Sequence, residues 1–322
     1  MREKKRPETS LESVATLLGR FVVRALLREV AAAPKPGLVD RFGSGSHSDM
    51  DFMTFTNSAL TLGPTFTACA YAGLLRGSVV PDWVCSESVY ISGSWFSGNL
   101  AITSADADFL SELRRIGIEG ERRMFEATGG VNTHRGAIFV VGLLAACVGV
   151  FIGAGSNMRN LGSNSRRLAA RVVQGISKRD LLGSDTHGGN VYRSHGFLGV
   201  RGEAESGFAS LDAGAMSMLR NVKGRYDDAV CVDALLSLMS VVDDTTVLYR
   251  GGIEALDYVK RSAAAALAIG GMGTSAGREA IANMSEEFPG RRISPGGSAD
   301  LLSAGLFLSS IEHFIGSAKS LS

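Results

Sequence analysis

The chain has 322 residues, of which 45% are hydrophobic and 20% charged, so it can bury a large core in one or two domains. Its 33 basic and 32 acidic residues leave a formal charge of +1, which argues against nucleic acid or an acidic membrane as a partner. The four cysteines are far apart in sequence and form no C-x-x-C pair. A disulfide framework or zinc site is therefore not expected, and a reducing, cytoplasmic location is favoured.

Apolar residues recur at three- and four-residue steps through nearly the whole chain, and this period predicts amphipathic helices. Pro34 and Pro36 end the first helix, and Gly63-Pro64 is a candidate break in the second. The predicted helices cover residues 11–32, 52–75, 109–125, 137–155, 165–176, 212–222, 227–242, 246–269, 275–287 and 298–315.

Strand signals are weak, and residues 89–92 form the best short candidate. The segment 153–165 is rich in Gly, Ser and Asn and is expected to be a flexible loop. We therefore predict an all-α, multi-helix globular bundle that forms one domain over residues 1–322, with residues 1–10 as a disordered N-terminus.

The run 137–155 contains no charge over 19 residues and is long enough to span a bilayer. It contains Gly142, Gly149 and Gly153 and several alanines, which suit close helix packing, and it directly follows the polar residues 132–135. A central helix that is buried on all sides produces the same pattern. We expect such a core helix, and no membrane association.

The first polar cluster, residues 34–51, combines prolines and glycines with many charges in one turn. Lys35 and Arg41 are suited to bind phosphate, and Arg41 can do so through a planar fork. A helix N-cap at Asp49 or Asp51 is the alternative to a ligand role there. Carboxylates are the oxygen ligands that Mg²⁺ takes together with substrate phosphates, and the candidates are Asp40, Asp49 and Asp51.

The second cluster follows a predicted helix that carries Glu121, a candidate base or metal ligand or a surface charge. Thr133 is the expected N-cap of the apolar helix. His134 and Arg135 then lie in its first turn, where the helix dipole attracts phosphate, with Asn132 beside them.

Three further clusters also lie between predicted helices. Arg201 and Glu203 form an ion pair of little energetic value, or Glu203 is a buried general base. Asp244 and Arg250 belong to a fourth cluster. The fifth is a Gly-rich turn whose backbone N–H groups can hold anions and whose candidate residues are Ser294, Gly296, Gly297 and Ser298. Neither a P-loop nor a Rossmann fingerprint occurs.

Taken in order, these clusters resemble the triphosphoribosyl-dephospho-coenzyme A synthases, which make the prosthetic-group precursor of citrate lyase and malonate decarboxylase. Two positions depart from the family pattern: Arg135 stands where lysine is more usual, and Thr246 where asparagine is expected. The matching segments are PKPGLVDR (34–41), GSHSDMD (45–51), TGGVNTHRGAIF (128–139), RGEAESGF (201–208) and SPGGSADLL (294–302).

The resemblance implies an all-α fold and the use of ATP and Mg²⁺. It also implies that the 5-triphosphoribosyl group of ATP passes to the ribose 2′-hydroxyl of 3′-dephospho-CoA, with release of adenine. Our candidates for catalysis are Glu121, Glu203, His134 and Asp300. Our candidates for ATP binding are Lys35, Arg41, Ser46, His47, Asn132, Thr133, Arg135, Arg201, Arg250, Ser294, Gly296, Gly297 and Ser298.

Cleavage of the N-glycosidic bond builds positive charge on the ribose, as in an oxocarbenium-like transition state. The carboxylates are candidates for base and charge stabiliser, and His134 for acid or phosphate contact. A Mg²⁺-dependent glycohydrolase of nucleotides or ADP-ribose is the alternative enzyme, and a helical nucleotide-binding or membrane-embedded protein is the non-enzymatic one. A downstream carrier-protein transferase and a homodimer are the other partners we consider.

Overall fold

In the computed structural model, which describes residues 8–79, 104–156, 158–175 and 186–319, every regular element is a helix. The predicted all-α class is therefore confirmed for this part of the chain. The helices, including the short 3₁₀ turns η3 and η4, are α1 (Glu8–Ala31), α2 (Phe52–Thr61), α3 (Gly63–Val79), α4 (Ser104–Ala127), α5 (Arg135–Gly153), α6 (Leu161–Val173), α8 (His187–His195), α9 (Val200–Glu205), η3 (Ala209–Ala213), α10 (Ala215–Asn221), α11 (Asp228–Met239), α12 (Thr245–Ala268), η4 (Gly271–Gly273), α13 (Ser275–Gly290) and α14 (Gly296–Lys319).

The boundaries differ from the prediction in a few places. The break at Gly63-Pro64 is confirmed, because α2 ends just before it and α3 begins there. The expected loop 153–165 is wrong in its second half, since α6 begins at Leu161. α1 begins at Glu8, inside the segment predicted to be disordered, while residues 1–7 and the strand candidate 89–92 lie outside the described residues.

Helix α5 is the central helix of the bundle, and it packs against α1, α3, α4, α6 and α14. It is the one described helix that is long and apolar enough to cross a bilayer, with a mean hydropathy of 2.5, but 78% of its most apolar window is buried inside the protein. The predicted buried core helix is therefore confirmed. The buried apolar side chains of all these helices form one cluster.

The contact between α3 and α5 depends on glycines that let the two backbones touch. A Cβ atom on Gly73 would lie 1.9 Å from the carbonyl oxygen of Ala146, and one on Gly149 would lie 2.4 Å from that of Ala70. Any side chain at these positions would force the helices apart. This explains why a helix with so many glycines is stable in the core, where glycine otherwise lowers helix propensity.

Three buried cysteines behave as the sequence suggested. Cys69, Cys147 and Cys231 are free thiols in apolar surroundings, and burial raises the pKa of Cys69 to about 12. They act as small hydrophobic side chains. The fourth, Cys85, lies outside the described residues.

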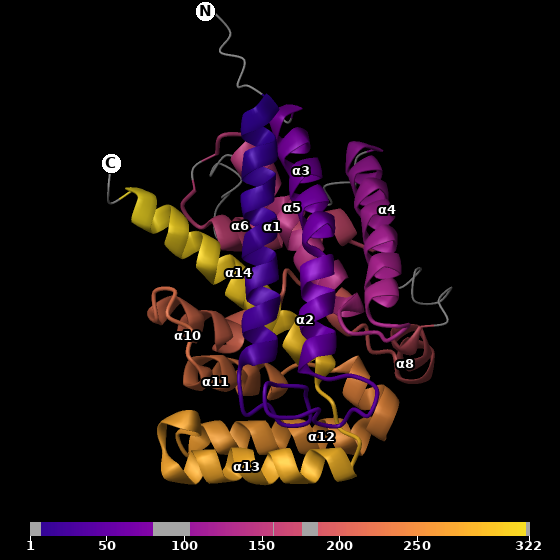
Figure 1. The fold of residues 1–322 in the computed structure, drawn as a ribbon, viewed down its shortest axis with the longest axis vertical. Coiled ribbons are helices and arrows are strands. Elements are labelled where there is room, and N and C mark those ends of the chain that lie inside the picture. Colours follow the sequence, from indigo (N-terminus) through magenta and orange to yellow (C-terminus); the bar gives the residue numbers. More distant parts are fainter. Residues whose placement is uncertain (1–7, 80–103, 157, 176–185, 320–322) are drawn as a thin grey trace, which may run out of the picture.

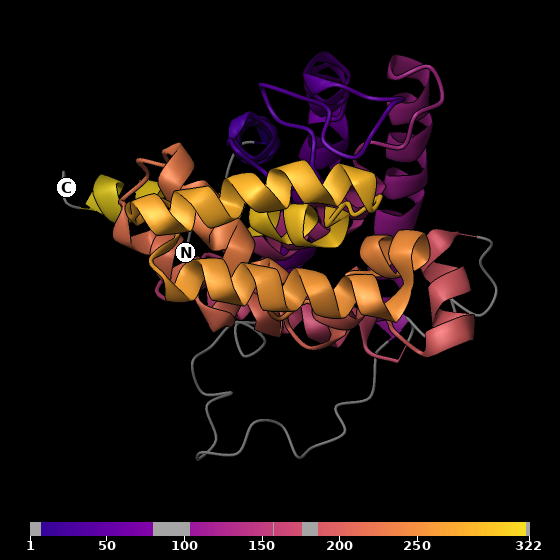
Figure 2. The same cartoon turned by 90° about the horizontal axis from the view of Figure 1, so that it is seen from below.

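Two layers of helices meet at one end of the bundle. α1, α3 and α4 stand upright, whereas α12 and α13 lie across their lower ends, and the loop that follows α1 runs between the two groups (Figure 1). Seen from below, α12 and α13 lie side by side and α14 runs behind them into the core (Figure 2). The first, second, fourth and fifth polar clusters are connected by contacts at this end.

The close α3–α5 contact predicts that one added methyl group at the interface destabilises the protein. Gly149→Ala should lower the free energy of unfolding by about 1–3 kcal/mol, because the backbone of α3 cannot retreat without opening the core. Gly117→Ala is the matched control: its Cβ would have 3.8 Å to the nearest side chain, on Ile138, and helix propensity should then stabilise the protein by about 1 kcal/mol. Urea denaturation measures both, and equal stability of the two variants would contradict the packing argument.

Candidate active site

A group of charged side chains is buried where the connecting segments meet, and we call it the polar centre. Neighbouring members interact directly or through their charges, although they come from four separate parts of the chain. Five of its residues are at most 8% exposed, and only Asp300 is partly open to solvent. Its residues are Glu29, Lys35, Asp40, His134, Asp244 and Asp300.

The ion pair between Lys35 and Glu29 lies at the heart of this group. The Lys35 ammonium donates to the Glu29 carboxylate, and their side chains are 1% and 5% exposed. Burial raises the pKa of Glu29, while the charge and hydrogen bond of Lys35 oppose that rise. The lysine predicted to bind phosphate therefore already has a carboxylate partner, and a substrate phosphate would have to share it.

Asp40 shapes the turn after α1. One of its oxygens accepts the backbone N–H of Lys35 at 3.0 Å, and the other accepts those of Phe42 and Gly43 at 2.8 and 3.1 Å. A carboxylate that accepts three backbone N–H groups holds a tight loop in one conformation. These hydrogen bonds give Asp40 a structural role that needs no metal ion. The predicted role of Asp40 as a magnesium ligand stays a prediction.

Arg41 connects the same turn to α11. Its guanidinium makes a two-pronged ion pair with Asp228, at 2.8 Å for the Nη1–Oδ1 contact, and also donates to the carbonyl of Ala31 at 2.6 Å. The hydrogen bond from Arg41 lowers the pKa of Asp228. Arg41 thus anchors the loop, and only the N–H groups that these contacts do not use remain for a phosphate.

Ser46 and His47 bring the first and fifth motifs together. The Ser46 hydroxyl donates to the carbonyl of Ile293, and His47 Nε2 lies 2.8 Å from the Ser294 hydroxyl. Arg250 donates to the carbonyl of Ser46 at 3.3 Å. Burial and the charge of Arg250 lower the pKa of His47, while Asp49 acts in the opposite direction. Segments almost 250 residues apart in sequence are therefore in direct contact.

His134 is the N-cap residue of α5, so the sequence-based choice of Thr133 as the cap is wrong by one residue. The Thr133 hydroxyl instead donates to Ser58 at 2.7 Å, and Ser58 lies 2.8 Å from His134 Nδ1. Burial, followed by the charge of Lys35, lowers the pKa of His134 to about 3. The imidazole is therefore neutral at neutral pH, which removes it as a cationic acid or cationic phosphate contact.

The other ring nitrogen of His134 lacks a partner. Ser58 lies against Nδ1, and the direction of that hydrogen bond depends on the tautomer of the ring. Nε2 is buried and has no hydrogen-bond partner among the described residues. An unsatisfied buried polar atom costs about 1–3 kcal/mol, so this end of α5 holds a group that a polar ligand atom would satisfy.

Asp244 joins the starts of α12 and α14. Its Oδ1 caps α12 by accepting the Thr246 N–H at 3.0 Å, and its Oδ2 accepts the N–H of Ser298 at 2.8 Å and its hydroxyl at 3.1 Å. A Cβ on Gly297 would lie 3.2 Å from this carboxylate, so glycine permits the approach. Thr246 contributes its backbone here, which is why threonine in place of the expected asparagine leaves the cap intact.

Asp300 lies against the first turn of α5. A Cβ on Gly136 would lie 1.8 Å from Asp300 Oδ2, and the Ala137 N–H donates to the carboxylate. Burial raises the pKa of Asp300 well above its ordinary range, and the neighbouring Asp244 and Glu29 raise it further. Two residues from distant motifs, Gly136 and Asp300, therefore form one contact.

The other two candidate carboxylates have side-chain partners. Glu121 accepts Nε and Nη2 of Arg135, each at 2.7 Å, and Arg135 also stacks over Phe125. The Arg135 N–H donates to Asn132 at 3.2 Å, so Asn132 orders the start of α5.

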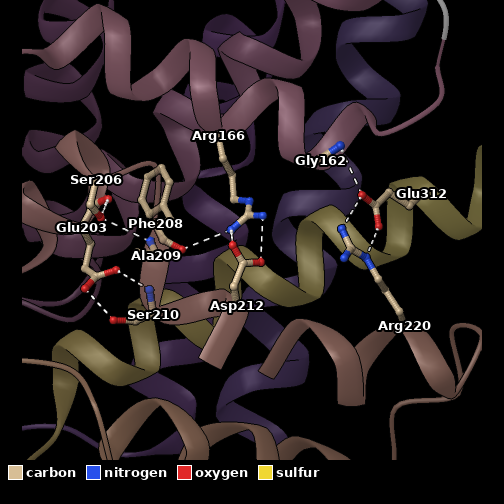
Figure 3. A network of polar contacts seen from close by, with 10 residues as sticks. All are labelled: Gly162, Arg166, Glu203, Ser206, Phe208, Ala209, Ser210, Asp212, Arg220 and Glu312. Carbon is tan, nitrogen blue, oxygen red and sulfur yellow. Dashed lines mark hydrogen bonds and ion pairs between the residues drawn. The ribbon is translucent and has the colours of Figure 1, made fainter. Parts of the chain in front are cut away.

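Glu203 accepts the hydroxyl of Ser210 at 2.6 Å and its N–H at 3.2 Å, as Figure 3 shows. Arg201, predicted to be its ion-pair partner, lies over the ring of Phe139 on α5, 5.3 Å from its centroid. Glu203 therefore holds η3 against α9, next to the Arg166–Asp212 ion pair of the same figure.

The three aspartates predicted as metal ligands do not form a preformed cage. Asp51 caps α2 through Thr54, at 2.8 Å, which confirms the alternative N-cap interpretation. Asp49 has a half-exposed side chain 3.8 Å from the ring of His47. Within the described ranges, no three His, Cys, Asp or Glu side chains are grouped as a metal site requires.

Sequence reasoning missed Glu29, Ser58 and Asp228, which bind Lys35, His134 and Arg41. Each lies in or at the start of a helix, outside the Gly- and Pro-rich turns that carry the polar motifs. A carboxylate at Glu29, on the apolar side of a helix next to Val30, was the one available signal. Charge on the buried side of an amphipathic helix needs a partner.

The fold and the polar centre together define a class: an all-α enzyme whose reactive groups come from inter-helix segments and from the first turns of three helices. Buried acids, a neutral histidine and arginines at one end of a bundle are suited to a charged, phosphorylated substrate.

Comparison with known proteins identifies the family. The family model for ATP:dephospho-CoA triphosphoribosyl transferase matches residues 15–318, and the chain belongs to that family. A Salmonella gallinarum protein described as a probable 2-(5''-triphosphoribosyl)-3'-dephosphocoenzyme-A synthase is 37% identical, over 97% of this chain and 95% of its own length. A Pseudomonas savastanoi pv. phaseolicola protein with the same description is 34% identical over 94% of both chains. No solved structure matches this chain. The protein is therefore a transferase, as its motifs suggested.

The lowered pKa of His134 predicts how stability depends on pH. The unfolded chain takes up a proton near pH 6.5 and the folded one only near pH 3, so acidification below about 6.5 favours unfolding by about 1.4 kcal/mol per pH unit. Between pH 7 and 5, wild type should lose about 2 kcal/mol more than His134→Gln. Denaturant unfolding at both pH values measures this difference, and parallel losses in the two proteins would show that His134 is not held neutral.

Proposed function

We propose that this protein transfers the 5-triphosphoribosyl group of ATP to the ribose 2′-hydroxyl of 3′-dephospho-CoA and releases adenine. The observation that carries the proposal is the polar centre, where the segments 34–51, 128–139 and 294–302 meet around buried acids. A glycosyl transfer needs such acids, because positive charge develops on the ribose as the bond to adenine breaks.

The triphosphate stays attached and has to be bound along its length. Arg135 and Arg250 contact the protein through some of their N–H groups only, and the remaining donors suit phosphate oxygens. The N–H groups of the turn 294–298 and the first turn of α5 add donors without charge. Lys35 and Arg41, with carboxylate partners, contribute mainly to the local potential.

Mg²⁺ would neutralise part of the charge on the triphosphate and hold its oxygens in one arrangement. Asp49 and Asp51 fit this need, because both side chains are exposed, Asp49 lies beside His47, and Mg²⁺ usually takes only one or two carboxylates together with phosphate oxygens. Asp40, whose oxygens accept three N–H groups, is the least suited of the three.

The remaining assignments follow from chemistry and composition. Reduced, buried thiols fit a cytoplasmic enzyme. The product carries a reactive triphosphate, so a transferase that attaches it to a carrier protein is the expected next enzyme. A homodimer is compatible with the exposed apolar side chains of α2 and α12, such as Leu60 and Ile253.

The reaction itself is tested by incubating the protein with ATP and Mg²⁺, with and without 3′-dephospho-CoA. We expect adenine and the mass of the triphosphoribosyl adduct only when the acceptor is present, and loss of both when EDTA removes the metal. Adenine release that does not depend on the acceptor would support the glycohydrolase alternative.

Glu203 is tested separately, because it is a candidate to stabilise the ribose charge. Glu203→Gln can keep a hydrogen bond to Ser210 but loses the negative charge. We expect unchanged ATP binding by calorimetry and a fall in adenine release of at least about 100-fold. Wild-type rates would remove Glu203 from the chemistry and leave it the role of holding η3.

A further inference from the structure

Three carboxylates are candidates for the base that activates the acceptor hydroxyl, and they differ in their hydrogen-bond and ion-pair partners. Glu121 is bound by the guanidinium of Arg135, and Glu203 receives two hydrogen bonds from Ser210. Asp300, by contrast, has no side-chain hydrogen bond or ion pair within the described part of the chain. A carboxylate neutralised by arginine is a poor proton acceptor, so the contacts favour Asp300.

Among the described residues, the contacts that hold Asp300 in place come from the backbone of α5. The Ala137 N–H at the first turn of α5 donates to it, and the missing side chain of Gly136 makes room for Oδ2. One carboxylate oxygen is thereby fixed while the group remains partly open to solvent. A base needs this combination of a defined position and an accessible lone pair.

A second, independent feature marks this end of α5 as a place where a ligand binds. The residue His134, two positions before Gly136, is 97% buried, and its Nε2 atom has no hydrogen-bond partner among the described residues. The Thr133–Ser58 chain occupies the other ring nitrogen, Nδ1. The start of the helix thus holds an unsatisfied neutral imidazole nitrogen two residues from the glycine that Asp300 contacts, which suits a substrate with both a hydroxyl to lose a proton and a second polar group to bind.

We infer that Asp300 is the general base that removes the proton from the 2′-hydroxyl of 3′-dephospho-CoA; this rests on the proposed function. The hydroxyl O–H bond breaks and its proton passes to the Asp300 carboxylate, while the oxygen forms a bond to C1 of the transferred ribose. The C1–N9 bond of ATP breaks, and its electron pair leaves with adenine, which takes a proton from solvent. Asp300 later returns its proton to solvent, so the step balances.

The charges around Asp300 determine the sign of its pH dependence. Asp244 and Glu29 act on it as like charges, Lys35 is paired with Glu29 and Arg41 with Asp228, and the neutral His134 contributes no charge. Burial, and then these two carboxylates, raise the pKa of Asp300, so it is a stronger proton acceptor than an ordinary aspartate. Activity should therefore rise with pH until Asp300 is ionised and level off above that point.

The test compares Asp300→Asn with wild type, using Asp257→Asn, an exposed aspartate on α12, as the matched control. Asparagine can still accept the Ala137 N–H, so folding and substrate binding, followed by circular dichroism and calorimetry, should be retained. We expect kcat for adduct formation to fall by at least about 100-fold, together with loss of the rising limb of the pH profile. The control should keep both.

A chemical rescue separates a base from a positioning role. In Asp300→Ala the cavity left by the carboxylate admits formate, and added formate should restore at least a tenth of the lost rate if a carboxylate is what the step lacks. Gly136→Ala should also slow the reaction, because its Cβ would displace Oδ2. In this variant kcat should fall while the Kd for ATP changes little.

The outcomes distinguish this inference from the proposed function. If wild type forms no adduct from ATP and 3′-dephospho-CoA, the proposed function fails. If wild type forms it and Asp300→Asn keeps the rate, or keeps the rising limb of the profile, Asp300 is not the base. A rate that falls with pH in wild type and loses this fall in Asp300→Asn would also overturn the inference, because it would make Asp300 an acid.

Discussion

The structure depends above all on the burial of α5. This helix is apolar enough to be surrounded on every side, and its glycines let α3 approach it backbone to backbone. Its first turn then lies deep in the protein, where unpaired N–H groups are costly. One acceptor supplied to that turn is Asn132, and another is the carboxylate of Asp300, from the other end of the sequence. The burial of α5 therefore packs the core and also positions Asp300 in the candidate site.

Charge in the polar centre is only partly balanced. Lys35 neutralises Glu29, but Asp244 and Asp300 rely on hydrogen bonds from hydroxyl and backbone groups. Burial raises the pKa of all three acids, and their mutual repulsion adds to the rise for Asp300. Such an arrangement is unfavourable for stability alone, and buried groups with shifted proton affinities are typical of catalytic sites.

Several residues singled out from the sequence hold the fold of the site together. Arg41 holds its loop to α11, Asp40 folds the loop on itself, and Asp244 ties α12 to α14. A motif read as a set of ligands thus contains residues that position other residues. The family motifs can contain ligand-binding residues and positioning residues alike, because loss of a positioning contact displaces the whole segment.

The sequence by itself determined the all-α class, the buried central helix, the break at Gly63-Pro64 and the family, since helical period, apolar run length and ordered motifs are local properties of the chain. Only the tertiary structure decided that Lys35 pairs with Glu29, that His134 is neutral, and that Asp300 lies on Gly136. These facts depend on contacts between residues far apart in sequence and on the low polarity that burial creates around them. Neither can be read from residue spacing, because proton affinity depends on which groups the folded chain brings together.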